Sequence, residues 1–409
     1  MNPALWSSLI QLTGSTASAL AAILVAAGMG LAAQGEFALL RSWNDVLVMV
    51  AVFGLPQGLL HMQYREDVPA AALQRWIARY LRSLSAVALA AVALSMLWLW
   101  VSPVPHLGQV AVLAAALPFA AAHQLWRSLA LKGAGVVAYA VVTAAPALLI
   151  LVGLAVLVLA NWNSGFEWVL WVAYALCAVL ARCVLRRVRD VAAEPRRWST
   201  APLWTASLQT GAQGLLIALL PAALLSVPGA LGASLAEIGI VSLGFQLYQV
   251  FGVVATCVVP LLYDRAARGR GPLDDRHWLT AIGWRLGLGR LAAVAVLCPL
   301  LPWIAALAWP SAGEFALPLS LMALAGELAL VVRVLWTLQQ ARGAYTLLSG
   351  QALARIVVAL GVAFLLLEDG VAATSAVPWC MVGIEAMTLA WLLAGMHTER
   401  RSGVRTPIE

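Results

Sequence analysis

Charged residues are scarce in this chain of 409 residues. Asp, Glu, Lys and Arg make up 11% of it, whereas hydrophobic residues make up 63%, and the mean hydropathy is +0.91. A water-soluble domain carries about 25% charged residues and does not need an apolar share of this size. The composition therefore excludes a soluble globular protein and predicts that most of the chain lies in a lipid bilayer.

Groups that carry catalysis or hold cofactors are also sparse. No glycine-rich phosphate loop or nucleophile motif stands before a predicted helix. The five cysteines and five histidines lack the spacing of metal ligands. We therefore expect no metal, no cofactor and no enzyme. An integral-membrane glycan polymerase or ligase is an alternative, but such an enzyme would be expected to have a large extracytoplasmic loop, and the exported connections here are short.

Long apolar runs are abundant. A helix needs about 20 residues to cross the roughly 30 Å of hydrocarbon in a bilayer, and about twelve runs of this kind recur along the chain. Runs such as 138–160 are apolar on every face, unlike the alternating strands of a membrane barrel. The predicted fold is therefore all-α and membrane-spanning. The expected spans are 5–30, 36–63, 80–102, 108–131, 135–160, 165–185, 202–228, 236–263, 281–308, 314–340, 344–367 and 372–396.

Arginine and lysine alternate between the connections of these spans. The connections after the even-numbered spans are basic, whereas those near 31–35, 103–108, 161–166, 229–235 and 309–313 hold no Lys or Arg. Because cytoplasmic connections retain Lys and Arg, both termini are predicted to be cytoplasmic. The net charge of +7 then follows from topology and contact with anionic lipid, without a nucleic-acid partner.

A sequence repeat divides the chain into two halves. The segment LWSSLIQLTG at residues 5–14 returns as LWTASLQTG at 203–211, and Glu36 and Glu237 open two further apolar runs at a similar offset. A period of roughly 200 residues indicates duplication of a whole domain. We predict a six-helix lobe at 1–190, a cytoplasmic linker at 191–201, a second lobe at 202–399 and a tail at 400–409. Two parallel lobes around a central cavity suit alternating access, and hence a transporter.

Short motifs in both halves resemble one transporter family. The segment GLAAQGEFALL at 30–40 followed by FGLP at 53–56, and AEIGIVSL at 236–243 followed by Pro260, are similar to polysaccharide flippases of the multidrug/oligosaccharidyl-lipid/polysaccharide exporter superfamily. The resemblance implies a carrier in the bacterial inner membrane that flips a polyprenyl-pyrophosphate-linked oligosaccharide to the periplasmic leaflet. It also implies that spans 1, 2, 7 and 8 line the cavity, and that membrane lipids and other polysaccharide-assembly proteins are partners.

Two charges in the second span are the leading candidates for substrate contact. Arg41 and Asp45 lie one helical turn apart, so they can form a structural ion pair, which is one interpretation. In the other interpretation Arg41 binds the pyrophosphate, for which a planar guanidinium is suited, and Asp45 holds it in place. The repeat places Ser242 and Gln246 at the equivalent positions of the second half.

Further candidates are polar groups on the expected cavity helices and charges in the second lobe. Pairing of Glu327 or Glu385 with an arginine of that lobe is a structural alternative for the charges, and packing bonds between helices are an alternative for the amides. The predicted substrate-binding residues beyond the first pair are Gln11, Gln209, Gln246, Arg290, Arg333 and Arg355.

A multidrug or cation antiporter of the same superfamily is the main competing function. Such a carrier needs a titratable carboxylate in its cavity, and Asp45 is the only one well inside spans 1, 2, 7 and 8. The neighbouring Arg41 would favour its ionised form, which argues against proton exchange.

Overall fold

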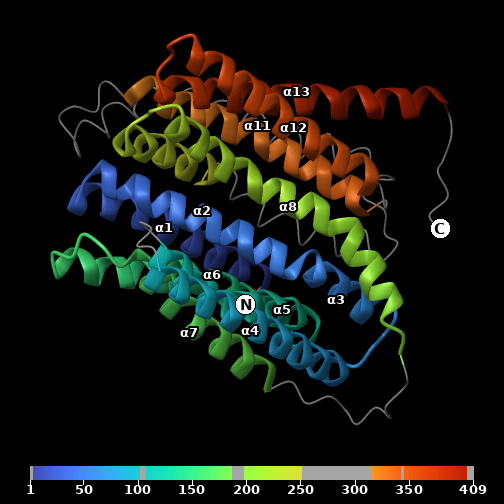
Figure 1. Cartoon of the computed structure of the whole chain (residues 1–409). Helices are drawn as coiled ribbons and strands as arrows, with labels where there is room; N and C mark the ends of the chain where they lie inside the picture. The colour runs from blue at the N-terminus through green and yellow to red at the C-terminus, as the bar shows by residue number, and fades with distance from the viewer. Residues whose placement is uncertain (1–2, 102–106, 187–197, 251–314, 342–344, 403–409) are drawn as a thin grey trace. The chain divides into compact units, whose positions relative to one another are not determined.

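A computed structural model describes residues 3–101, 107–186, 198–250, 315–341 and 345–402, and every regular element in these ranges is a helix (Figure 1). The predicted all-α fold is confirmed. Nine of the described helices are long and apolar enough to cross a bilayer, or ten if a bent pair counts as one span. The predicted span 281–308 and most of the second half of span 236–263 lie outside the described residues.

The described helices are α1 (Pro3–Met29), α2 (Leu31–Val52), α3 (Leu55–Tyr64), α4 (Ala70–Val101), α5 (Leu107–Gly133), α6 (Val136–Leu159), α7 (Phe166–Arg186), α8 (Ala201–Ala230), an unlabelled helix Leu235–Val250, α11 (Ala316–Ala341), α12 (Tyr345–Glu368) and α13 (Ala373–Ser402).

The described residues form two compact units. The first lies within residues 1–25 and 37–222, and the second lies within 26–36 and 223–409. Each unit therefore takes in part of a helix from the other sequence half: most of α8 packs in the first unit, and the start of α2 packs in the second. The predicted division at 190–202 describes the sequence repeat, and it stays a prediction.

The expected single span at 36–63 is two helices, α2 and α3, which meet at an angle of 46°. Gly54 has a φ of 75° and Phe53 a φ of 23°. A right-handed helix requires negative φ values, so it ends at these two residues. Pro56 sits in the first turn of α3, where its missing N–H costs nothing. The hydroxyl of Tyr80 on α4 donates to the carbonyl of Ala51, one of the groups that the break leaves without a helical partner.

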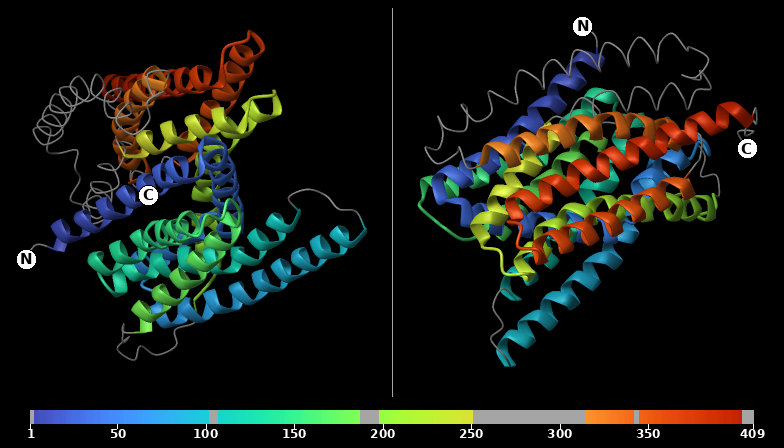
Figure 2. Two further views of the ribbon diagram at one scale, coloured as in Figure 1. Left: turned by 90° about the vertical axis from the view of Figure 1, so that its left-hand side faces the viewer. Right: turned by 90° about the horizontal axis from the view of Figure 1, so that it is seen from above.

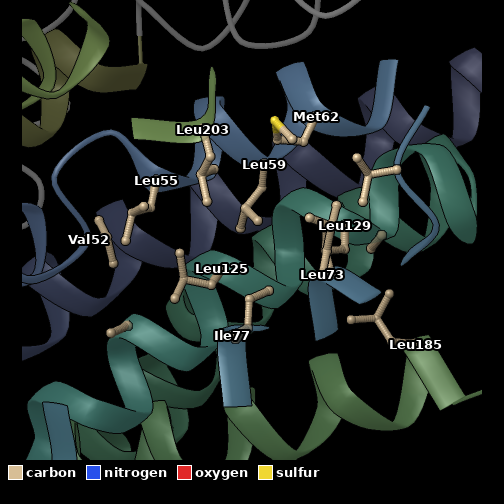
Figure 3. Packing of buried hydrophobic residues seen from close by; sticks show 13 residues of the cluster. Val52, Leu55, Leu59, Met62, Leu73, Ile77, Leu125, Leu129, Leu185 and Leu203 are labelled. Atoms are coloured by element: carbon tan, nitrogen blue, oxygen red, sulfur yellow. The ribbon is translucent and has the colours of Figure 1, made fainter. Parts of the chain in front are cut away.

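A hydrophobic cluster fixes α3 in the first unit (Figure 3). Leu55 and Leu59 are buried between α4, α5 and the start of α8. The cluster contains Val52, Leu55, Leu59, Met62, Val68, Leu73, Ile77, Ala121, Leu125, Leu129, Ala130, Leu185 and Leu203. Because lipid tails are as apolar as leucine, close packing rather than escape from water stabilises such a cluster within a bilayer.

The second half of α4 has a different environment. It extends away from the other helices of its unit in the right-hand view of Figure 2, and its apolar side chains, such as Leu94 and Trp98, are exposed. An apolar surface of this kind suits contact with lipid.

The loop after α3 is tied to the end of α5. The ammonium of Lys132 lies 2.9 Å from a carboxylate oxygen of Asp67 and donates to the carbonyl of Gln63. The hydrogen bond and the charge of Lys132 lower the pKa of Asp67 below its ordinary value of 3.8.

This shift predicts the pH dependence of the contact. A lowered folded-state pKa means that the pair stabilises the protein above pH 3.8 and ceases to do so as the pH falls through the lower, folded value. We expect Asp67→Asn to lower the melting temperature slightly at neutral pH, because the pair is exposed. The difference from the parent protein should vanish in acid. An equal difference at pH 7 and at pH 3 would contradict this assignment.

In the second unit, two glycines let the start of α2 cross the helix Leu235–Val250 at backbone distance. A Cβ atom on Gly35 would collide with the carbonyl oxygen of Leu235, and one on Gly239 would collide with that of Leu31. Small residues at a crossing are typical of helix pairs in membranes. The two Leu-x-x-x-Gly segments therefore meet reciprocally.

The reciprocal crossing offers a second register for the repeat. Matching the two Leu-x-x-x-Gly segments places Phe245 and Gln249 opposite the two charged residues of α2, whereas the starts of the apolar runs place Ser242 and Gln246 there. The equivalence of Ser242 and Gln246 with the two charged residues stays a prediction.

A glycine substitution tests the crossing. Gly239→Ala should destabilise the protein by about 1–3 kcal/mol, because its methyl group has only backbone to displace. Gly361→Ala on α12 is the matched control, since nothing lies within 4 Å of the added Cβ there. Alanine is the better helix former, so the control should be neutral or stabilising. Equal melting temperatures for the two variants in detergent would refute the close crossing.

Candidate functional site

Arg41 projects from α2 toward α1 in the first unit. Its Nη2 donates to the hydroxyl of Ser18 at 3.0 Å. Its Nη1 is buried and has no hydrogen-bond partner. Within the described part of the chain, Arg41 forms no ion pair, so its charge is held in place by a neutral group.

Asp45 has a different partner. The hydroxyl of Tyr174 on α7 lies 3.5 Å from its Oδ1, and much of the Asp45 side chain is exposed. The expected ion pair with Arg41 is absent from the described structure, although the two charges are near enough to attract each other. Spacing of one helical turn permits a pair, but here one side chain reaches α1 and the other reaches α7.

Asn44 lies between these two charges in the sequence and is only 1% exposed. Neither its amide nitrogen nor its amide oxygen makes a well-aligned hydrogen bond, although the side chain lies close enough to the Asp45 carboxylate to interact with it. A buried polar atom without a partner costs about 1–3 kcal/mol, and few native side chains leave both atoms in this state.

Sequence reasoning missed Ser18, Asn44 and Tyr174. Asn44 carried a usable signal, since it is an amide in an apolar span beside two charges. Ser18 and Tyr174 carried none, because their relevance comes from contacts between helices that are distant in sequence.

The three predicted glutamines differ in environment. Gln11 is buried and donates to Ser7 one turn earlier on α1 at 3.3 Å, Gln209 is exposed, and Gln246 is partly buried. A further amide, Gln34, donates to the hydroxyl of Ser242 at 3.0 Å in the second unit. Gln11 and Gln34 therefore make bonds within and between helices, and a substrate role for Gln11, Gln209 and Gln246 stays a prediction.

The second unit holds a buried charge network. Arg355 on α12 binds both carboxylate oxygens of Glu385 on α13, with 3.2 Å between Nη1 and Oε2 and a shorter contact between Nη2 and Oε1. Tyr248 donates to the same carboxylate at 2.8 Å. Glu385 is fully buried and Arg355 is 7% exposed. The predicted pairing of Glu385 with Arg355 is confirmed, as one of the combinations considered.

Aromatic rings extend this network. The guanidinium of Arg355 lies 5.0 Å from the ring centre of Trp336, whose indole N–H donates to Gln351 at 2.8 Å. The guanidinium of Arg333 lies 5.4 Å from the ring centre of Tyr248. Such contacts stabilise a desolvated cation. A substrate role for Arg355 would require this pair to open, and Arg290 lies outside the described residues.

The sequence matches no family model and no curated protein. Solved structures do match. One is an inward-facing multidrug resistance MATE family transporter of the MOP superfamily, at 13% identity and a TM-score of 0.72 over 97% of this chain and 100% of that one. A mutant of the Vibrio cholerae MATE transporter VcmN matches at 15% identity and a TM-score of 0.67, over 98% and 97% of the two chains.

The chain has the fold of MATE family transporters. Another protein with this fold is a MOP superfamily transporter from Pyrococcus furiosus, at 12% identity and a TM-score of 0.58 over 97% of this chain and 96% of that one. That protein is described as having a binding pocket of reverse polarity, which suggests a different function for it. At these identities the likeness defines the fold of this multi-pass membrane protein, while its substrate has to be inferred from its own residues.

Proposed function

We propose that the protein is a secondary transporter that flips a polyprenyl-pyrophosphate-linked oligosaccharide by alternating access. The movement would run from the cytoplasmic to the periplasmic leaflet of a bacterial inner membrane, during synthesis of a surface polysaccharide. The observation that carries this proposal is the state of Arg41, a half-buried cation with an unpartnered Nη1 and no ion pair in the described chain.

Arg41 has the chemistry that a pyrophosphate needs. A guanidinium stays charged at all physiological pH values and offers parallel N–H groups that match two phosphate oxygens. Ser18 orients one nitrogen and leaves the other available. A cation that forms no ion pair with a carboxylate among the described residues is costly in an apolar span, which favours a functional role over a structural one.

Proteins with the MATE fold differ in the polarity of their binding pockets. They include multidrug transporters and the Pyrococcus furiosus protein of reverse pocket polarity. This range supports an anion-binding carrier on the same scaffold.

A multidrug or cation antiporter is the second candidate, and Asp45 favours it. Arg41 was expected to favour the ionised form of Asp45 and so to oppose proton exchange. The two charges are near enough to attract each other, but they form no ion pair in the described chain, and Asp45 is exposed. A carboxylate of this kind could bind a cation. Solved multidrug transporters with the same fold add to its weight.

Deletion of the gene in its host separates the two candidates. The flippase proposal predicts loss of a surface polysaccharide and accumulation of its lipid-linked intermediate, measured by mass spectrometry of extracted lipids. The antiporter predicts greater sensitivity to cationic drugs with an intact surface glycan. Drug sensitivity with an intact surface glycan would make the antiporter the preferred function.

A further inference from the structure

Arg41 and Asn44 place three buried polar atoms without a well-aligned hydrogen bond within one turn of α2, and the Asp45 carboxylate is the polar group that lies beside Asn44. These atoms are Nη1 of Arg41 and both amide atoms of Asn44. Residues three apart on a helix share a face, so the unpartnered groups point in a common direction. This part of α2 faces α1 through Ser18 and α7 through Tyr174.

The chemistry of the three atoms is complementary to a phosphorylated sugar. Nη1 and the amide nitrogen are donors, which suit phosphate oxygens, and the amide oxygen is an acceptor, which suits a sugar hydroxyl. The contact with Asp45 is the one local role for an amide at this position, and a leucine of similar size would avoid burying both amide atoms without well-aligned hydrogen bonds.

We propose that Asn44 is a substrate-binding residue, whose amide N–H binds the diphosphate beside Arg41 and whose carbonyl accepts from the first sugar. This proposal rests on the flippase function and names a further part of the same site. Asn44 is buried in the described arrangement, so ligand access requires α1 or α7 to move from α2 during the transport cycle. Asn44 is then satisfied only in the loaded carrier.

The substitution Asn44→Leu tests the proposal because binding and packing predict different results. Removing two unpartnered polar atoms should leave the purified protein at least as thermally stable as its parent. Translocation of the lipid-linked oligosaccharide in vesicles should fall at least about tenfold, as expected for loss of a hydrogen bond to a charged group. Inorganic pyrophosphate should raise the melting temperature of the parent protein but not that of the variant.

Gln63→Leu is the matched control. Gln63 is a buried amide with an unpartnered Oε1 on α3, away from the proposed site. We expect it to keep both translocation and the response to pyrophosphate. Asn44→Ala provides a second variant should the leucine prevent folding, and it should show the same loss of translocation.

The outcomes distinguish a failure of the Asn44 proposal from a failure of the flippase proposal. If both Asn44 variants translocate within twofold of the parent protein while Arg41→Ala does not, Asn44 is a structural residue and the flippase function stands. If Arg41→Ala is also fully active, neither residue belongs to the substrate site, although the flippase function stands. If the parent protein itself shows no translocation, the flippase proposal fails and the role of Asn44 fails with it.

Discussion

We expect Arg41→Ala to abolish translocation of a lipid-linked oligosaccharide, although the protein should still reach the membrane in normal amount. This is the largest effect that the site predicts. The alanine removes the charge and the unpartnered Nη1 together. It leaves Ser18 without the donor it now accepts from. Loss of one hydrogen bond by an uncharged hydroxyl costs far less than loss of a phosphate contact, so folding should be little affected.

Two further variants serve as controls for Arg41→Ala. Arg41→Lys keeps the charge but not the planar fork, so it should retain partial activity. Arg127→Ala removes another arginine of the first unit, one that lies over the ring of Tyr139 at 5.8 Å from its centre, and it should transport normally. Full activity of Arg41→Ala at parental abundance would exclude Arg41 from the substrate site.

Glu385→Ala should have the largest effect on stability. It leaves the Arg355 guanidinium buried without a counter-charge and takes the acceptor from Tyr248. Breaking one partner of a buried ion pair costs about 3–5 kcal/mol. The helix Leu235–Val250, α12 and α13 lose their shared contact at the same time, so we expect little folded protein after detergent extraction.

A double substitution separates the pair from its surroundings. Arg355→Met with Glu385→Leu removes both charges and fills similar volume, which should restore most of the melting temperature lost by Glu385→Ala. A Glu385→Ala protein as stable as its parent would show that the pair contributes nothing to the fold. Normal transport by the stable double variant would assign Arg355 a structural role.

Composition and periodicity predicted the helices well, because a bilayer requires long apolar segments with internally paired backbones. The break in the span 36–63 was within reach of the sequence, since Gly54 and Pro56 adjoin there. The contacts made at the break could not be predicted, because Tyr80 and α8 approach it from segments distant in sequence. Likewise, the glycine crossing in the second unit could not be predicted, because it depends on contact between helices.

The candidate site was predicted only in part. Charges stand out in an apolar chain, so Arg41, Asp45, Arg355 and Glu385 were found at once. Their partners depend on helix rotation, which a single sequence does not define. Arg41 therefore turned out to contact Ser18 rather than Asp45, while Glu385 turned out to contact Arg355.

The central claim is tested most directly with purified protein in sealed lipid vesicles. A polyprenyl-pyrophosphate-linked oligosaccharide is added to the outer leaflet, and the fraction of its sugar protected from an external glycosidase is followed with time. Our account predicts protein-dependent protection that is lost in Arg41→Ala. Protection no faster than in protein-free vesicles, together with uptake of a cationic drug by the same vesicles, would contradict it.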